Sequence, residues 1–551
     1  MNKKNSQTKQ ILGMAYENHR KGNLKLAESL YKKIIKIESN NFEPVFLLGS
    51  LLLQKKNFDD AIPLLEKAIL MEPNHANSYQ NLGFALIEIG EFAKATEALK
   101  KAIKIQPNHV EAHFNLANVY KQMGDFKKAR MFYEKTIEIQ PNNPSALNNL
   151  ANIYKRLGEF TKAIDSYNKA IQIKPNHARA HHNLGNTYNQ LGEFTKAIAS
   201  FKKSFEYVPS NLESLYMWGD LDKGILNLEL KKKIKYIMKN GNLLKKEVAY
   251  GNFLFAKYEF QNRNFEQEFD YLLEAHQNYF DSNKKFFQKG INYWLKDLPK
   301  IKELEKLDGP DIKNDVKPIF ILGTPRCGST LVEKVIASGE KYIPIGEESA
   351  VLSFFVSEIV LTKQSFSSNI ENLKNKINAK YKELGLLKKE NDYIFTDKTL
   401  DNFFFLGLIK KIFPQAKVIN CRRNPLASIM SILKNNLGDV AWAHNIEHIF
   451  SYFDLYYKKI NFFKKSFPNF IYDLQFENFQ NDPENESKKL MQFCNLSWNK
   501  KCLEFYKRKD IVSYTASHRQ IRNPIYKESI DKYQPYKSLL NRYGNKYNWF
   551  S

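Results

Sequence analysis

The sequence predicts a multi-domain protein in which an all-helical repeat array is followed by an α/β domain with a parallel sheet. Three observations carry this prediction. Alanine, proline and glycine recur every 34 residues through the first 211 of the 551 residues. Beyond residue 317, short apolar runs end in polar turns, which is typical of buried parallel strands. One of these runs, within 318–331, continues through a glycine-bearing turn into a helical pattern.

The first 211 residues repeat at a fixed interval. Each unit contains two amphipathic helical patterns: a glycine closes the first helix, and a small alanine lets the second helix pack closely on it. Lys56 stands where other units have the glycine. The pattern resembles the tetratricopeptide repeat, and six units over 8–211 are expected to stack into a solenoid. The recurring positions are Ala27, Ala61, Ala95, Ala129, Ala163 and Ala197; Pro73, Pro107, Pro141, Pro175 and Pro209; and Gly22, Gly90, Gly124, Gly158 and Gly192.

An array of this kind has a concave face that suits an extended peptide or a partner helix. An asparagine recurs on the first helix of successive units, at Asn81, Asn115, Asn149 and Asn183. Each amide offers both a donor and an acceptor, so this asparagine ladder either clamps a peptide backbone or holds the repeats together. Both interpretations stay open at this point. The first makes a peptide or protein a predicted partner of the array.

Between the repeats and the α/β domain, the helical pattern continues without a clean period. Residues 212–303 are predicted to be a helical extension, and 253–279 within it resembles one degenerate repeat that lacks the turn glycine. Residues 304–317 contain Gly309-Pro310 and are the predicted linker. The α/β domain is expected over 318–551.

The composition restricts the partners and the compartment. A formal charge of +25 favours anionic partners, although scattered lysines on a solvated surface explain the excess equally well. The anionic partners that the charge allows are a doubly phosphorylated nucleotide, acidic substrates, nucleic acid and an anionic membrane face; of these we expect the nucleotide and no nucleic acid. The four cysteines have no metal-ligand spacing, so no metal is expected, and their small number indicates a reducing, cytoplasmic compartment. Because no apolar run approaches about 18 residues, no transmembrane segment is expected. The oligomeric state is left open.

The turn after the first predicted strand has the pattern of an anion-binding loop. Gly323 and Gly328 frame the turn, and Ser329 and Thr330 open the following helix. This arrangement directs backbone N–H groups and a helix dipole at an anion. A P-loop triphosphatase needs lysine at the position of Ser329. Here the cation lies inside the loop instead, at Arg326.

The segment Thr-Pro-Arg-Cys-Gly-Ser-Thr-Leu, residues 324–331, resembles the 5′-phosphosulfate loop of sulfotransferases. The likeness is greatest to the tyrosylprotein sulfotransferases and to bacterial sulfotransferases that carry tetratricopeptide repeats. It implies a P-loop-like sulfotransferase domain that uses 3′-phosphoadenylyl sulfate (PAPS) as co-substrate. It also implies that the loop binds the 5′-phosphosulfate and that its arginine takes part in catalysis. The implied contacts are Arg326, Cys327, Gly328, Ser329, Thr330 and Leu331.

Two further segments supply the predicted catalytic pair. Gly-Glu-Glu-Ser at 346–349 resembles the segment that carries the base of tyrosylprotein sulfotransferases, and Glu348 is the carboxylate that aligns. A positioned carboxylate can take the proton of an acceptor hydroxyl. Alternatively, the two glutamates only begin a helix, whose dipole favours them. Glu347 is expected to orient its neighbour. Lys398 follows a predicted strand at 393–395, and the resemblance makes it the cation that meets the leaving phosphate.

A third segment is predicted to bind the other end of the nucleotide. A strand over 416–421 is followed by Arg423, with Ser431 eight residues later. Sulfotransferases grip the 3′-phosphate with such a pair, since arginine supplies a forked set of donors and the hydroxyl completes the pocket. The other interpretation of this segment is a solvated turn. A weaker resemblance in the tail assigns nucleotide contacts to Ser517, Arg522 and Lys532, in a loop that closes over the cofactor.

Together these residues predict in-line transfer of a sulfuryl group from PAPS to an acceptor hydroxyl. The acceptor is a protein tyrosine, a glycan or a small molecule, and nothing in the sequence chooses among them. Two other interpretations remain. One is an ATP-using, P-loop kinase-like enzyme, which Ser329 disfavours. The other is a repeat scaffold whose nucleotide-binding domain is inactive.

Overall fold

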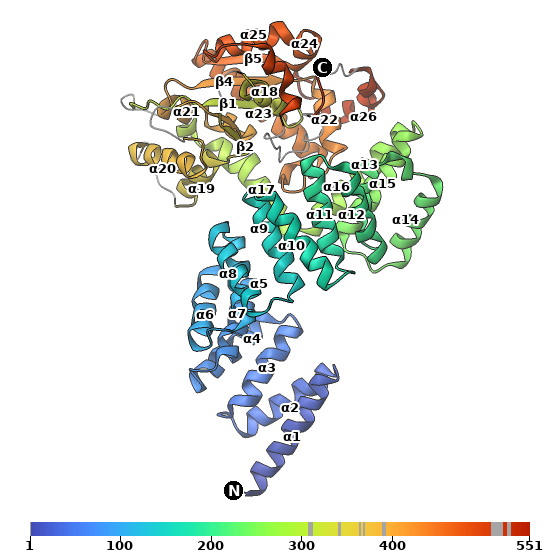
Figure 1. Cartoon of the computed structure of the whole chain (residues 1–551), viewed down its shortest axis with the longest axis vertical. Helices are drawn as coiled ribbons and strands as arrows, with labels where there is room; N and C mark the ends of the chain where they lie inside the picture. Colours follow the sequence, from blue (N-terminus) through green and yellow to red (C-terminus); the bar gives the residue numbers. More distant parts are fainter. Residues whose placement is uncertain are drawn as a thin grey trace. The chain divides into compact units, whose positions relative to one another are not determined.

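The computed structural model divides into two compact units, Met1–Thr187 and Tyr188–Ser551. Figure 1 shows a helical first part and a second part that contains both helices and a sheet. The predicted fold class, a helical repeat solenoid followed by an α/β domain with a parallel sheet, is confirmed. The structure describes residues 2–306, 312–339, 343–362, 365–366, 370–387, 393–508, 522–525 and 530–550.

The repeats form successive pairs of antiparallel helices. The turn glycines adopt left-handed backbone, with φ of 80° at Gly22 and 85° at Gly90, which a glycine enters without steric cost. Lys56 takes the same conformation at φ 58°. All six recurring alanines are fully buried, so the predicted close packing is confirmed. The helices are α1 (Asn2–Arg20), α2 (Leu24–Ile37), α3 (Phe42–Gln54), α4 (Phe58–Met71), α5 (Ala76–Glu88), α6 (Phe92–Ile105), α7 (Val110–Gln122), α8 (Phe126–Ile139), α9 (Pro144–Arg156), α10 (Phe160–Ile173), α11 (Ala178–Leu191) and α12 (Phe194–Tyr207).

The asparagine ladder is used between repeats. Asn81 Nδ2 donates to Ser50 Oγ at 2.8 Å, one unit earlier. Asn183 Nδ2 donates to Asn148 Oδ1 at 3.0 Å, again across a repeat boundary. These contacts favour the interpretation in which the ladder holds the repeats together over the one in which it clamps a peptide.

The second unit begins with further helices. The degenerate repeat predicted at 253–279 falls within the helix pair α15 and α16, and Arg263 takes the left-handed turn position at φ 60° that glycine holds in the repeats. Buried side chains of these helices belong to the same apolar core as the sheet. The elements are α13 (Leu212–Leu221), η1 (Lys223–Ile225), α14 (Leu228–Asn240), α15 (Lys245–Gln261), α16 (Phe265–Ser282), α17 (Lys284–Ile291), η2 (Asn292–Asp297), η3 (Leu298–Lys300) and η4 (Lys302–Leu304).

The sheet of the second unit is parallel, with strand order β2-β3-β1-β4-β5 within the described residues. Its strands are β1 (Ile319–Gly323), β2 (Ile345–Glu347), β3 (Thr396–Lys398), β4 (Lys417–Arg422) and β5 (Ile471–Gln475). All residues of β1 are buried, which explains its continuous apolar run. The strand predicted at 393–395 begins three residues later, at Thr396, so Lys398 is its last residue rather than the residue beyond it.

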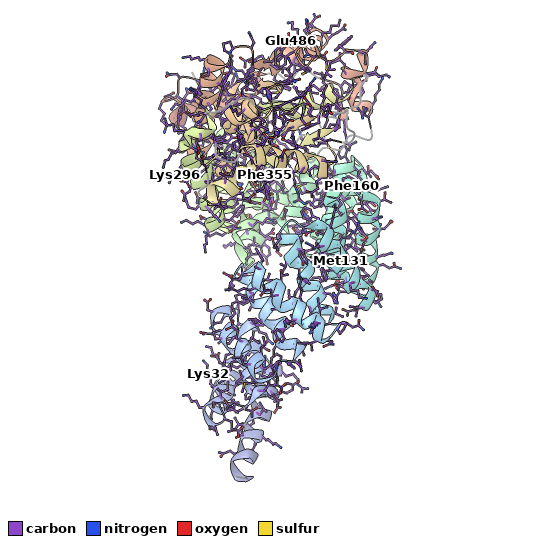
Figure 2. All side chains as sticks on the ribbon, turned by 90° about the vertical axis from the view of Figure 1, so that its left-hand side faces the viewer. Lys32, Met131, Phe160, Lys296, Phe355 and Glu486 are labelled. Atoms are coloured by element: carbon purple, nitrogen blue, oxygen red, sulfur yellow. The ribbon has the colours of Figure 1, made fainter. Side chains whose placement is uncertain are left out.

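Helices cover the sheet on both faces and complete the apolar core. Phe355 of α19, labelled in Figure 2, is one of the buried side chains in it. Among the described residues, no helix combines the length and the apolar character that crossing a membrane requires. The remaining elements are α18 (Ser329–Ala337), α19 (Val351–Thr362), α20 (Ile370–Glu383), η6 (Leu400–Phe405), α21 (Leu406–Ile412), α22 (Pro425–Leu433), η7 (Ala441–His444), α23 (Ile446–Ser466), α24 (Phe476–Asn481), α25 (Pro483–Phe493), η8 (Lys500–Lys507), η10 (Ile530–Tyr536) and α26 (Lys537–Gly544).

Candidate active site

The predicted site residues gather where the parallel strands end. β1 ends at Gly323, β2 at Glu347, β3 at Lys398 and β4 at Arg422. Because the strands are parallel, these carboxyl ends share one edge of the sheet, where open α/β sheets bind their ligands. The topology therefore brings together segments that lie up to about a hundred residues apart in sequence.

The loop between β1 and α18 is tightly constrained. A Cβ on Gly323 would lie 2.4 Å from Cys327 Sγ, and a Cβ on Gly328 would lie 2.2 Å from the Phe476 ring. Gly328 has φ 93° and Arg326 has φ 70°, so the loop contains a left-handed non-glycine residue as well. Strained backbone of this kind costs about 1 kcal/mol or more and concentrates at functional sites. The loop thus keeps a fixed shape ahead of the first turn of α18.

The residues predicted to bind the 5′ and the 3′ end of the nucleotide are joined by direct hydrogen bonds. Arg326 Nε donates to Ser431 Oγ at 3.0 Å. Arg423 Nη1 donates to the Arg326 carbonyl oxygen at 2.9 Å. The Arg423 guanidinium also lies 5.3 Å from the Phe476 ring centre and 5.9 Å from that of Tyr533. The arginines predicted for opposite ends of one nucleotide therefore line one continuous surface.

Lys398 is buried beside the loop. Its Nζ donates to Thr330 Oγ1 at 3.3 Å and to Glu347 Oε1 at 3.1 Å, and its side chain is 2% exposed. Burial alone would lower the pKa of Lys398, but the charges of Glu347, Glu333 and Glu348 outweigh it and hold that pKa above its usual value. The ammonium is therefore charged at neutral pH and faces the first turn of α18.

A second lysine and a second glutamate complete this buried cluster, and the sequence did not reveal them. Lys334 Nζ lies 3.6 Å from Glu333 Oε2 and 3.6 Å from Glu347 Oε2. Glu333 Oε1 accepts from the Thr396 hydroxyl at 2.8 Å. Burial raises the pKa of Glu333, with Lys334 and Lys398 acting against that rise. Glu347 is consequently shared by two buried ammonium groups.

Glu348 differs from Glu347 in its exposure to solvent. It is exposed and lies just beyond the end of β2 with φ 53°, and its backbone N–H donates to the Lys398 carbonyl at 3.3 Å. Ala350 is also left-handed, with φ 51°. Two strained residues within three positions fix the direction of this turn. The Glu348 carboxylate is thus held near Lys398 while open to a substrate.

Two buried aspartates behind this turn are further groups that sequence reasoning missed. Asp397 Oδ2 accepts from the Tyr381 hydroxyl at 2.6 Å and from the Ser349 hydroxyl at 2.8 Å. Asp401 Oδ1 accepts from the Tyr452 hydroxyl. Burial raises the pKa of Asp401 to about 6, against a lowering contribution from that hydroxyl, and the charge of Glu348 raises it further. Only the position of Asp397 at a strand end offered a signal.

Comparison with known proteins agrees with this geometry. The sequence model of the sulfotransferase family matches residues 318–500, which span all five strands. Residues 318–500 are a sulfotransferase-family domain. Tetratricopeptide-repeat models match 19–83, 52–117, 86–153, 151–192 and 178–211, so the repeats are confirmed as well. The nearer resemblance to tyrosylprotein sulfotransferases stays a prediction.

Individual relatives match parts of the chain. An uncharacterized protein of Aquifex aeolicus (strain VF5) is 28% identical over 316 residues, which are 53% of this chain and 40% of that protein. The crystal structure of the MamA protein is 30% identical, covering 31% of this chain and 94% of its own, at a TM-score of 0.29. Pseudomonas aeruginosa PilF is 18% identical over 39% of this chain and 98% of its own, at a TM-score of 0.36.

Of the three nucleotide contacts predicted in the C-terminal tail, only Arg522 has a side chain that the structure describes. Arg522 Nη2 donates to the Gln190 carbonyl oxygen at 2.8 Å, and its guanidinium packs against Gly192. This contact gives no support to a nucleotide role for Arg522. Ser517 lies outside the described residues, and so does the side chain of Lys532.

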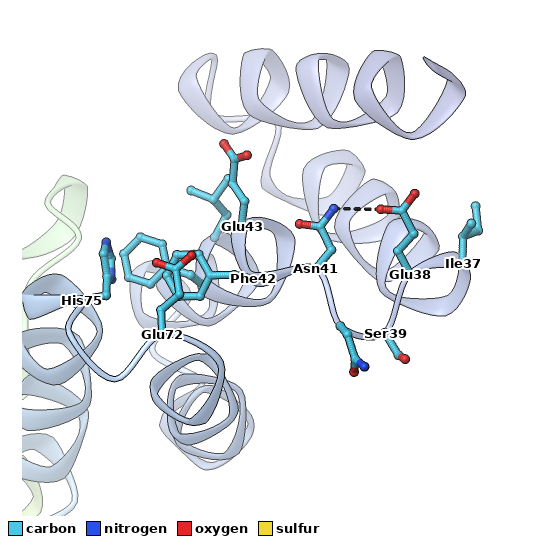
Figure 3. Close-up of a pocket in the computed structure, with 11 residues that line it drawn as sticks. Ile37, Glu38, Ser39, Asn41, Phe42, Glu43, Glu72 and His75 are labelled. Carbon is cyan, nitrogen blue, oxygen red and sulfur yellow. Dashed lines mark hydrogen bonds between the residues drawn. The ribbon is translucent and has the colours of Figure 1, made fainter. Parts of the chain in front are cut away.

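Two open cavities differ in charge. One of about 1120 Å³ is lined by four cationic residues, Arg422, Arg423, Lys458 and Lys546, and by two carboxylates, Asp454 and Glu477. Another cavity, of about 1110 Å³, lies among the repeats of the first compact unit and is drawn in Figure 3. Its lining includes the carboxylates of Glu38, Glu43 and Glu72, which repel an anionic nucleotide. Among the described residues, no group of three or more His, Cys, Asp and Glu side chains is placed to hold a metal ion.

Proposed function

We propose that the protein is a PAPS-dependent sulfotransferase that moves a sulfuryl group to an acceptor hydroxyl. The observation that carries the proposal is the pair of hydrogen bonds linking Arg326 to Ser431 and Arg423 to Arg326. A nucleotide phosphorylated at both its 3′ and 5′ positions needs two anion sites close together, and these contacts support the proposal because they put the two predicted sets of residues next to each other.

The 5′-phosphosulfate lies against the loop after β1. Arg326 and the N–H groups of the first turn of α18, at Gly328, Ser329 and Thr330, meet its negative charge. Arg423 and Ser431 bind the 3′-phosphate, where a forked guanidinium and a hydroxyl recognise a group that ATP lacks. Selectivity for PAPS over ATP follows from this second site.

The transfer step uses Glu348 and Lys398. The acceptor hydroxyl loses its proton to a Glu348 carboxylate oxygen as its own oxygen attacks the sulfur atom. The bond from sulfur to the bridging phosphate oxygen breaks, and that oxygen leaves with the electron pair on 3′,5′-bisphosphoadenosine (PAP). Lys398, charged and adjacent to Thr330, stabilises this new negative charge.

Glu347 serves as the orienting residue rather than the base. Its Oε1 accepts from Lys398 at 3.1 Å, and its Oε2 lies 3.6 Å from Lys334. A carboxylate that is buried and engaged by two ammonium groups is shielded from an acceptor hydroxyl, so it is poorly placed to act as the base. The Glu348 side chain is exposed at the same edge of the sheet, where an acceptor hydroxyl can reach it. This difference assigns the base to the second glutamate of the pair.

The repeats recruit a peptide or protein, either the acceptor itself or a separate partner. Tetratricopeptide repeats present an extended surface of this kind. In this proposal the enzyme acts in a reducing compartment such as the cytoplasm, in keeping with its free, buried cysteines.

Calorimetric titration with PAP and with ATP tests the nucleotide assignment. We expect PAP to bind at least tenfold more tightly, and a preference for ATP would refute the proposal. Mass spectrometry of tyrosyl peptides, glycans and phenols incubated with PAPS then tests the reaction through a gain of about 80 Da, the mass of one sulfuryl group. Glu348→Gln should keep PAP affinity and lose turnover. Equal turnover would remove Glu348 as the base.

A further inference from the structure

The helical extension is directly connected to the helix that carries Ser431. α16 packs against both α22 and η10. His276 Nε2 of α16 donates to the carbonyl oxygen of Leu433, the last residue of α22, at 2.9 Å. Lys434, the next residue, lies 2.9 Å from Glu268 Oε1, also of α16. The C-terminal end of α22, two residues past Ser431, is therefore tied to a segment outside the matched family domain.

Glu268 also holds the C-terminal element η10. The Tyr536 hydroxyl donates to Glu268 Oε2 at 2.5 Å and accepts from Lys434 Nζ at 2.8 Å. The Lys434 ammonium additionally lies 3.9 Å from the Phe260 ring centre and 4.5 Å from that of Tyr536. Glu268, Lys434 and Tyr536 form a closed triad in which each member contacts the other two.

Both partners of Glu268 sit one short turn from a residue of the nucleotide surface. Lys434 is three residues beyond Ser431, which accepts from Arg326. Tyr536 is three residues beyond Tyr533, whose ring lies 5.9 Å from the Arg423 guanidinium. Residues three apart share one face of a helical turn, so a shift of either partner moves the nucleotide contact with it.

We infer that Glu268 is a positioning residue for the nucleotide site, holding α22 and η10 in the register that sets Ser431 and Tyr533 against the two arginines. This inference rests on the proposed function. Glu268 is suited to the role because its side chain is only 2% exposed and both carboxylate oxygens are used. A neutral amide is a poor replacement: Gln has one acceptor oxygen, so its NH₂ group would face either the Lys434 ammonium or the Tyr536 hydroxyl.

Glu268→Gln in the full chain tests the inference, with Glu259→Gln as the matched control. Glu259 is also a buried carboxylate of the extension, and its side chain pairs with Lys231 and Asn264 of the same extension. We expect Glu268→Gln to weaken PAP binding at least tenfold and to raise the KM for PAPS while kcat changes little. Glu259→Gln should leave both unchanged.

Hydrogen exchange of the free protein supplies a readout independent of any ligand. Glu268→Gln should speed amide exchange in α22 and η10, and the Glu268→Gln/Lys434→Met double variant, which leaves no unpaired buried charge, should recover part of the PAP affinity. If Glu268→Gln matches Glu259→Gln in exchange and affinity, the inference is overturned. If the wild type binds no PAP, the proposed function falls, and the exchange result alone decides whether Glu268 holds the two elements.

Discussion

Replacement of Glu347 by glutamine tests the buried charge cluster most directly. The cluster contains two lysines, Lys334 and Lys398, and two glutamates, Glu333 and Glu347, all with side chains at most 3% exposed. In Glu347→Gln, two buried ammonium groups face a single carboxylate. Removing one partner of a buried pair costs about 3 to 5 kcal/mol, because the remaining charge is left without compensation. We expect a loss of about 3 kcal/mol in the free energy of unfolding at pH 7.

The same change alters the pH dependence of activity. Glu347 is the first of the charges that hold the pKa of Lys398 above 10.5. A lysine with a raised folded-state pKa contributes stability below its unfolded pKa and loses that contribution as pH rises through the folded value. Without Glu347, burial dominates and the Lys398 pKa falls. The alkaline limb of kcat should therefore move to lower pH, by one unit for each 1.36 kcal/mol of lost interaction.

Urea denaturation at pH 7 and kcat profiles from neutral to alkaline pH measure the two effects. The Lys334→Met/Glu347→Gln double variant is the control, since it restores the charge balance and should recover part of the stability. The reasoning would be refuted if the free energy of unfolding of Glu347→Gln lay within about 1 kcal/mol of the wild-type value and the alkaline limb of its kcat profile stayed at the same pH.

Three other changes follow from the site geometry. Ser431→Ala removes the acceptor of Arg326 Nε and should weaken PAP binding about tenfold by calorimetry, the equivalent of about 1.4 kcal/mol. Gly328→Ala forces a Cβ into the Phe476 ring at φ 93° and should cost at least about 2 kcal/mol in urea denaturation and abolish PAP binding. Asp401 binds its proton more tightly folded than unfolded, because its pKa rises from 3.8 to about 6. The free energy of unfolding of the wild type should thus fall as pH rises between these values. Relative to the wild type, the free energy of unfolding of Asp401→Asn should rise by up to about 3 kcal/mol between pH 4 and pH 7. A difference between the two proteins that stays constant with pH would contradict this.

The repeats and the anion loop could be predicted because their physics is local. The 34-residue period reflects one close helix contact in each repeat, and the spacing from Gly323 to Gly328 reflects a single turn. The positions of Lys398 and Arg423 at strand ends were accessible for the same reason, although β3 begins at Thr396 rather than Tyr393.

The buried cluster could not be predicted in this way. In the sequence of α18 the apolar residues Leu331, Val332, Val335 and Ile336 have helical spacing, whereas Glu333 and Lys334 are charged residues of types that are mostly exposed in proteins. In the structure α18 contacts β1, β2 and β3 as well as η8, so both charged side chains are buried. Burial of these two side chains depends on segments distant in sequence. Asp401 was missed for the same reason, since its hydrogen-bond partner Tyr452 lies 51 residues further along the chain.

The side-chain hydrogen bonds between repeats affect how the solenoid unfolds and how it binds partners. Each bond, such as that from Asn81 to Ser50, couples one unit to its neighbour, so melting of one repeat withdraws a contact from the next. With such nearest-neighbour coupling, an internal repeat is stabilised by two neighbours and a terminal repeat by one, so the array should open from its ends. A ligand that enters the groove also finds these amides already engaged, so its recognition has to depend on side chains that vary from unit to unit.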